Sequence, residues 1–170
     1  MKFKIGDNVV YGGNGVCKII GIKDMSFFNE APKKYYVLAP VFTKQSSVMY
    51  VPLDSKVMVD KLSHVIDKEE AMSLIRSLPD NNIDWIEDKN LRKDTFNSIV
   101  TKGTRKEIMG VIKAVLTRRA ELTSEGKRLN MQDEKTLFDA EARMNAEIAI
   151  ALDMDPDEVP DFIRREASIA

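Results

Sequence analysis

The residues of this chain that could catalyse reactions or hold metals do not fall into a recognisable catalytic or metal-binding pattern. It contains one histidine, His64, and one cysteine, Cys17, and neither lies in a nucleophile motif or in a Cys/His cluster with metal-ligand spacing. The alternating aspartates of DMDPDE, residues 153–158, are typical of a calcium loop, but its sixth and twelfth positions would hold Glu158 and Arg164 instead of glycine and glutamate. We therefore expect no enzymatic activity, and no bound metal or cofactor.

The most informative residues surround Trp85, the single tryptophan of the chain. On a helix, Lys89 and Arg92 would fall near the same face as Trp85, so this face would be both aromatic and cationic. Trp85 could be a core anchor whose ring is covered by Arg92 through a cation–π contact. Alternatively, it could be an exposed wedge that stacks on a partner while the cations hold a polyanion. Because tryptophan is usually largely buried, the residues alone favour the core anchor.

Charge is unevenly distributed along the chain, although the formal net charge is only −1. Residues 104–130 carry seven basic and three acidic residues, whereas residues 131–170 carry four basic and eleven acidic ones. Neutralised phosphates supply most non-specific affinity for nucleic acid, so this chain should bind DNA weakly by itself. The basic segment is explained either by a solvated helix face or by phosphate contacts near Trp85.

Residues 1–65 have the pattern of a small β module. Short runs rich in β-branched and aromatic residues alternate with turn signals. The predicted strands are DNVVY, VCKIIGI, KYYVLAPV and SVMYVPL, and GGNG at residues 12–15 suits a hairpin turn between the first two. The link before the third strand carries Phe27 and Phe28, which either fold back onto the module or form part of a partner surface.

Residues 66–170 have the pattern of a compact helical domain. Capping-box spacing at Asp67 and Thr104 precedes apolar stripes with helical period. The predicted helices cover approximately residues 67–78, 85–102, 104–122 and 133–152, with a short last helix after Asp155. The sequence therefore predicts a β-barrel-like module joined to a helical domain near residues 64–67.

The cellular setting follows from what the sequence does not contain. No stretch approaches the roughly 18 apolar residues of a membrane span, and MKFKIGDNVVYGG has too short an apolar run for a signal peptide. A single cysteine fits a reducing compartment. We expect a cytoplasmic protein that does not contact membranes.

Taken in order, several motifs resemble the CarD/CdnL family of bacterial transcription regulators along essentially the full chain. They are FKIGDNVVYGGNGV (3–16), MYVPL (49–53), the lone Trp85, KGTRKE (102–107), LTRRAEL (116–122) and EKTL with its following helix (134–152). The N-terminal part is also similar to the polymerase-interacting module of transcription-repair coupling factors.

The resemblance implies an α+β protein with a small Tudor/SH3-like β-barrel (1–65) and a compact all-helical C-terminal domain (66–170). The first domain would bind the β subunit of RNA polymerase. The second would touch promoter DNA at the upstream edge of the transcription bubble, where Trp85 would wedge into the minor groove and stabilise the open complex. The wedge is then preferred to the core anchor. A polymerase tether raises the effective concentration of the protein at the promoter, so little intrinsic DNA affinity is needed. A monomer is expected, because a single polymerase contact and a single wedge need no second copy.

The resemblance also assigns residues to both contacts. The expected DNA-binding residues are Trp85 as the wedge, Lys89 and Arg92 as its phosphate neighbours, and Lys113, Lys127, Arg128 and Lys135 as weaker backbone contacts. The expected polymerase-binding residues are Lys23, Met25, Val48, Met49, Tyr50 and Val51.

Two departures from the family pattern change these expectations. Some members have arginine where Met25 and Tyr50 stand here, so strand pairing and apolar contact should matter more than ion pairs. Glu87 and Asp88 follow Trp85 where basic residues are common, and they would repel nearby phosphates. The alternative hypothesis is a protein-binding scaffold, with an SH3-like module, a helical adaptor, Trp85 in the core and no DNA contact.

Overall fold

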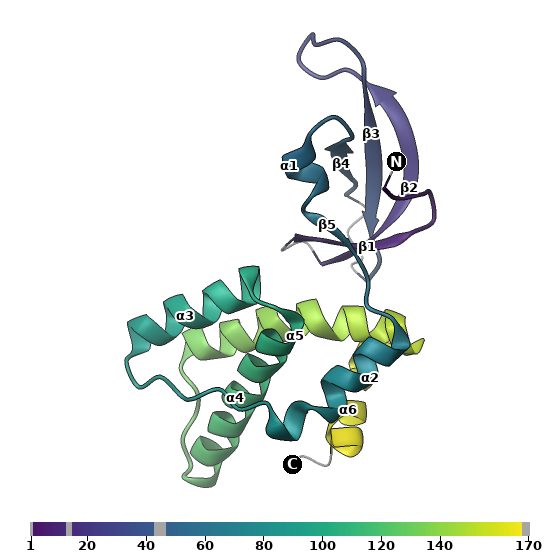
Figure 1. Ribbon diagram of the computed structural model, residues 1–170. Helices are drawn as coiled ribbons and strands as arrows, with labels where there is room; N and C mark the ends of the chain where they lie inside the picture. The colour runs from purple at the N-terminus through teal and green to yellow at the C-terminus, as the bar shows by residue number, and fades with distance from the viewer. Residues whose placement is uncertain (1, 13–14, 43–46, 168–170) are drawn as a thin grey trace. The chain divides into compact units, whose positions relative to one another are not determined.

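The computed structural model describes residues 2–12, 15–42 and 47–167. The chain folds as two compact units, Met1–Val65 and Ile66–Ala170, of which the first is built mainly of strands and the second of helices (Figure 1). No helix in the described part of the chain combines the length and the hydrophobicity needed to cross a bilayer.

The N-terminal unit is a five-stranded antiparallel sheet. Its elements are β1 (Asn8–Tyr11), β2 (Val16–Met25), β3 (Lys33–Pro40), β4 (Met49–Pro52), a short helix α1 (Lys56–Val59) and β5 (Leu62–His64). The strand order β4-β3-β2-β1-β5 makes β4 and β5 the edge strands. The four predicted strands are confirmed, whereas α1 and β5 were not predicted. Residues 13 and 14 of the predicted GGNG turn lie outside the described residues, and closure into a Tudor/SH3-like barrel stays a prediction.

The core of this unit is formed by the inward side chains of the central strands. Val9 of β1 pairs with Cys17 of β2, and both are fully buried. Burial raises the pKa of the Cys17 thiol, which makes it an unreactive packing residue. The backbone N–H of Phe3 donates to the hydroxyl of Tyr36 at 3.3 Å, so the N-terminal segment is tied to β3. His64 lies on edge strand β5, where its ring packs against Phe3 at an interplanar angle of 54°, with centroids 4.8 Å apart.

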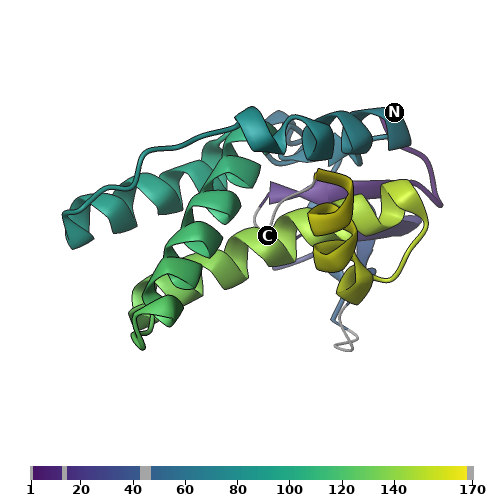
Figure 2. The ribbon, with the colours of Figure 1, turned by 90° about the horizontal axis from the view of Figure 1, so that it is seen from below.

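The helical unit contains five α-helices and two short 3₁₀ turns among its described residues. They are α2 (Lys68–Arg76), η2 (Leu78–Asp80), α3 (Lys89–Lys102), α4 (Arg105–Ser124), α5 (Met131–Leu152), η3 (Pro156–Glu158) and α6 (Val159–Ala167). Helix α4 runs across α3 and α5 (Figure 2). The buried side chains at these crossings include Phe96, Ile108, Met144 and Ile148. The predicted caps Asp67 and Thr104 are confirmed, since each side chain accepts the N–H three residues later.

The start of the second predicted helix was wrong. Helix α3 begins at Lys89 instead of directly after Asp84, because the Asp88 side chain is the cap and accepts the Leu91 N–H at 2.8 Å. Residues 81–88 are therefore not helical. Trp85 precedes the helix and does not share a helix face with Lys89 and Arg92.

A buried carboxylate connects the first residue of the helical unit to two of its long helices. Glu147 of α5 is only 1% exposed. Its Oε1 lies 2.7 Å from both Nε and Nη2 of Arg105 on α4 and accepts the Ile66 N–H at 3.1 Å. A buried charge is tolerated when it is paired in this way, but it becomes costly when one partner is removed.

We expect Glu147→Ala to lower the free energy of unfolding of the helical unit by about 3–5 kcal/mol, because it leaves Arg105 and the Ile66 amide without this acceptor. Urea denaturation followed by Trp85 fluorescence measures this unit specifically. Glu134→Ala is the matched control on the same helix: its carboxylate is half exposed and 3.7 Å from Arg119, so its loss should cost less than about 1 kcal/mol. Equal losses in the two variants would contradict this assignment.

Candidate functional site

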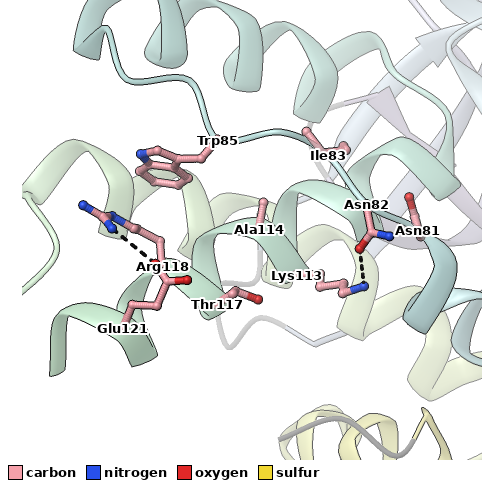
Figure 3. Close-up of a pocket in the computed structure, with 9 residues that line it drawn as sticks. All are labelled: Asn81, Asn82, Ile83, Trp85, Lys113, Ala114, Thr117, Arg118 and Glu121. Atoms are coloured by element: carbon pink, nitrogen blue, oxygen red, sulfur yellow. Dashed lines mark hydrogen bonds and ion pairs between the residues drawn. The ribbon is translucent and has the colours of Figure 1, made fainter. Parts of the chain in front are cut away.

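Residues 81–88 form an extended strap that runs from η2 to α3 and lies against α4 (Figure 3). Between the strap and the helix is a shallow pocket of about 210 Å³. It is lined by Asn81, Asn82, Ile83 and Trp85 of the strap and by Lys113, Ala114, Thr117, Arg118 and Glu121 of α4. Trp85 lies at one end of this pocket, beside Arg118.

The strap approaches α4 closely at a glycine. Asn81 is 8% exposed, and its side-chain amide donates to the carbonyl of Lys106 at 2.7 Å. A β-carbon on Gly110 would lie 2.6 Å from Cδ1 of Ile83 and 2.9 Å from Oδ1 of Asn81. Both distances are shorter than real β-carbon contacts, so a side chain at residue 110 would require Ile83 and Asn81 to shift, and glycine lets the strap pack closely against α4.

A lysine holds the beginning of the strap. The ammonium group of Lys113 donates to the carbonyls of Leu78 and Pro79 and to Oδ1 of Asn82, all at 2.9 Å. These acceptors satisfy the three donors of the ammonium group. The expected DNA contact at Lys113 is therefore corrected: this side chain positions the strap.

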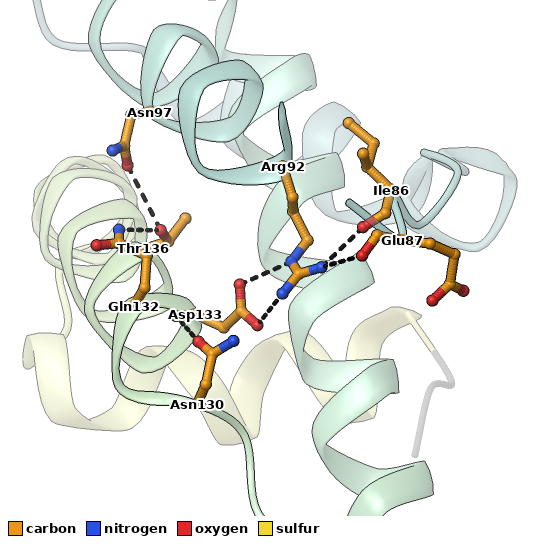
Figure 4. Close-up of polar contacts among 8 residues, drawn as sticks. All are labelled: Ile86, Glu87, Arg92, Asn97, Asn130, Gln132, Asp133 and Thr136. Carbon is orange, nitrogen blue, oxygen red and sulfur yellow. Dashed lines mark hydrogen bonds and ion pairs between the residues drawn. The ribbon is translucent and has the colours of Figure 1, made fainter. Parts of the chain in front are cut away.

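Arg92 holds the other end of the strap (Figure 4). Its Nε and Nη2 donate to the two carboxylate oxygens of Asp133 at 2.9 and 2.8 Å, and its Nη1 donates to the carbonyls of Ile86 at 2.8 Å and Glu87 at 3.3 Å. Arg92 is 5% exposed and Asp133 is 4% exposed. The expectation that Arg92 binds a DNA phosphate is thus wrong, because its guanidinium is buried and bound within the chain.

The ring of Trp85 is half-buried and contacts three side chains. It packs edge-to-face against Phe96, with centroids 6.0 Å apart and an interplanar angle of 70°. The guanidinium carbon of Arg92 lies 4.5 Å from the ring centroid, and that of Arg118 lies 5.9 Å from it. The structure therefore shows the Arg92 contact of the core-anchor interpretation on a ring that still retains exposed surface.

Arg118 is the functional candidate that the sequence did not single out. Its side chain is 37% exposed and pairs with Glu121 at 3.2 Å on the same helix. It belongs to the basic segment 104–130, for which the sequence offered phosphate contacts near Trp85 as one explanation, but no pattern distinguished Arg118 from the other cations of that segment. Arg118 is a partly exposed cation that contacts the tryptophan ring.

The other predicted DNA-binding residues lie on exposed positions of different segments. Lys89 is exposed at the first turn of α3. Lys127 and Arg128 are exposed in the connection between α4 and α5, where Lys127 pairs with Glu125 at 3.4 Å. Lys135 is exposed on α5 and pairs with Asp139 at 2.7 Å. The cations that contact the Trp85 ring in the described part of the chain are instead Arg92 and Arg118.

The two acids after Trp85 have structural roles. Asp88 caps α3, and the backbone carbonyl of Glu87 accepts from Arg92. Both side chains are exposed. Their negative charge favours the positive end of the α3 dipole but lowers the affinity of this edge of the site for phosphate.

In the N-terminal unit, the expected polymerase-binding residues gather at edge strand β4 and the end of β2. Lys23 and Tyr50 are exposed, Met25 and Met49 are half-buried, and Val48 is 37% exposed. The Val51 side chain is fully buried in the core, so only the backbone of Val51 could meet a partner, and its role in polymerase binding stays a prediction. The backbone of β4 on the side away from β3 remains at the edge of the sheet.

Comparison with known protein families gives a match in the N-terminal unit. Residues 3–66 match the family described as CarD-like/TRCF RID domain. The match covers most of the N-terminal unit and less than half of the chain, so the N-terminal unit is similar to this family. The match confirms the resemblance seen in the sequence for this unit and indicates a protein-interaction role in transcription. No curated protein matches the chain.

We expect Gly110→Ala to lower the free energy of unfolding by about 1–3 kcal/mol, because the added methyl group overlaps Ile83 and Asn81. At an open helix position the same change would instead stabilise by about 1 kcal/mol. Displacement of the strap should also shift Trp85 emission to longer wavelength.

Ile83→Ala provides the matched control, because it removes Cδ1 and Cγ1 of Ile83 near the added methyl group and leaves Oδ1 of Asn81 in place. Adding Gly110→Ala to Ile83→Ala should therefore lower the free energy of unfolding by less than Gly110→Ala does in the otherwise unchanged chain. If Gly110→Ala is stabilising in the otherwise unchanged chain, the close approach of strap and helix is not as described.

Proposed function

We propose that this chain is a non-enzymatic transcription regulator that binds RNA polymerase through its CarD-like/TRCF RID domain and promoter DNA through its helical unit. The observation that carries the proposal is the family match over residues 3–66. The resemblance of the later motifs to CarD/CdnL regulators extends the proposal to the helical unit. We expect the protein to act as a monomer in the cytoplasm.

The proposed polymerase contact is strand addition at β4 to the β subunit. An edge strand presents unpaired backbone N–H and C=O groups on one side, and an incoming strand can bind them while side chains give specificity. The exposed side chains of Val48 and Tyr50 add apolar surface beside that edge. Some family members have arginine where Met25 and Tyr50 stand here. Strand addition with apolar contacts does not depend on such ion-pairing side chains.

The proposed DNA contact is the exposed part of the Trp85 ring, inserted into the minor groove at the upstream edge of the bubble. The clamp of Arg92 and Phe96 fixes the ring before DNA arrives, which reduces the entropy lost on binding. Arg118 and Lys89 are the cations best placed to meet adjacent phosphates. Lys127, Arg128 and Lys135 remain weaker candidates for backbone contacts.

A small interaction is enough for such a regulator. A wedge that contacts only the open state changes the open-complex equilibrium tenfold for about 1.4 kcal/mol of interaction. Binding to polymerase raises the effective concentration of the helical unit near promoter DNA. The weak DNA affinity expected from the low net charge of the chain is therefore compatible with this role.

One observation favours the scaffold hypothesis. Trp85 packs against Phe96 and belongs to the periphery of the helical core, as it would in a domain that never meets DNA. The regulator and the scaffold hypotheses predict different effects of removing the Trp85 ring on the lifetime of open complexes.

We expect wild-type protein to lengthen the lifetime of open complexes formed by the cognate polymerase at a ribosomal RNA promoter. Trp85→Ala should lose most of this effect, roughly tenfold if the ring contributes about 1.4 kcal/mol. The lifetime is measured as the decay of complexes after addition of a competitor.

Phe138→Ala is the matched control, because it removes an aromatic ring that is 72% exposed on α5. Circular dichroism and retention by polymerase show whether each variant is folded and bound. A folded, polymerase-bound Trp85→Ala protein that matches wild type would favour the scaffold. Failure of wild type to bind polymerase would overturn the proposal as a whole.

A further inference from the structure

The turn between β2 and β3 places a phenylalanine in a backbone conformation that this residue rarely adopts. Phe28 has φ of 53° and Asn29 has φ of 62°, and the Glu30 N–H donates to the Phe27 carbonyl at 3.1 Å. Positive φ at both central residues is the requirement of a type I′ turn, which favours Asn-Gly. Asparagine tolerates this conformation, but the β-carbon of Phe28 makes it unfavourable.

No burial of the Phe28 side chain within its own domain offsets this unfavourable conformation. It is 98% exposed, the highest value among the exposed large apolar side chains of the described residues. A polar residue or glycine at this position would avoid both the backbone strain and the hydration of an aromatic ring. Strain and apolar exposure at one residue indicate a function that lies outside the isolated chain.

The preceding residue fixes the base of the turn. Phe27 folds back, with its ring centroid 5.3 Å from Tyr35 on β3 and 5.8 Å from Tyr50 on edge strand β4. The hydroxyl of Ser26 donates to the carbonyl of Glu30 and closes the turn. The two adjacent phenylalanines thus have different roles: Phe27 is packed, and Phe28 is presented on a supported turn.

We propose that Phe28 is an apolar anchor that inserts into an apolar pocket on the RNA polymerase surface that pairs with β4. This inference rests on the proposed function, and it adds a contact beyond the residues expected from the resemblance. The Phe27 ring links the turn to Tyr50, so the anchor and the edge strand belong to one continuous surface. In strand addition the backbone pairing contributes affinity and side chains that enter pockets contribute specificity, and a few anchors in desolvated pockets usually dominate binding.

The charges around the turn favour a protein partner over nucleic acid. Lys33 pairs with Glu30 at 3.5 Å and Asp54 at 3.7 Å, and Lys34 pairs with Asp24 at 3.7 Å. These cations are balanced by carboxylates, whereas phosphate binding requires an excess of positive charge. The exposed Phe28 ring surrounded by paired charges is complementary to a partner surface that has an apolar pocket with a polar rim.

The test compares binding of the full chain and its variants to purified cognate RNA polymerase by biolayer interferometry. We expect Phe28→Ser to weaken binding about 10- to 100-fold and Phe28→Leu to retain most of it. Ile5→Ser is the matched control: Ile5 is 62% exposed and lies in the N-terminal segment that leads into β1, so this change should leave affinity unchanged.

Phe28→Gly separates binding from folding. Glycine adopts the positive φ without penalty, so this variant should melt several degrees higher than wild type while binding polymerase as weakly as Phe28→Ser. A destabilised loss-of-binding variant cannot give this combination.

The outcomes distinguish this anchor from the proposed function. If wild type binds and Phe28→Ser binds equally well, the anchor is overturned and the polymerase contact stands. If wild type does not bind, the proposed function fails and the anchor fails with it. If Phe28→Ser instead abolishes self-association seen by analytical ultracentrifugation and leaves polymerase affinity unchanged, the occupant is a second copy, and the proposal is wrong.

Discussion

The buried guanidinium of Arg92 is the interaction on which the helical unit's candidate site depends. It joins Asp133 of α5 to two carbonyls of the strap and lies over the Trp85 ring. A charge at 5% exposure is tolerated because its hydrogen bonds are made within the chain, and removal of one partner of such a pair typically costs about 3–5 kcal/mol. The same group therefore stabilises the packing of α3 on α5 and orients the tryptophan.

This clamp explains how one tryptophan can be both a packed and a presented residue. Arg92 and Phe96 hold one part of the ring, Arg118 approaches it from α4, and the remainder is accessible. Gly110 and Lys113 keep the non-helical strap close to α4, so the ring is carried by a supported segment. Preorganised aromatic groups lose little conformational entropy on binding, which suits a contact that must be effective although it is small.

Local sequence signals predicted the elements but not the long-range contacts. The strands and the caps at Asp67 and Thr104 depend on neighbouring residues and were predicted, whereas three acids within five residues made the start of α3 ambiguous until Asp88 was seen to cap it. The short α1 and β5 have too few residues for a periodic pattern. The burial of Arg92 could not be predicted, because its partner Asp133 is 41 residues away. Similarly, the backbone carbonyls that bind Lys113 have no signature in the sequence, so this lysine was indistinguishable from a DNA-binding one.

Time-resolved fluorescence anisotropy of Trp85 tests the central claim most directly, because this is the only tryptophan in the chain. If Arg92 and Phe96 hold the ring as described, the wild-type decay follows the tumbling of the helical unit with little faster motion. In Arg92→Met, which removes the charge and its hydrogen bonds, a large subnanosecond component should appear. Free rotation of the ring in the wild-type protein, or an unchanged decay in the folded variant, would contradict the clamp and the preorganised wedge that depends on it.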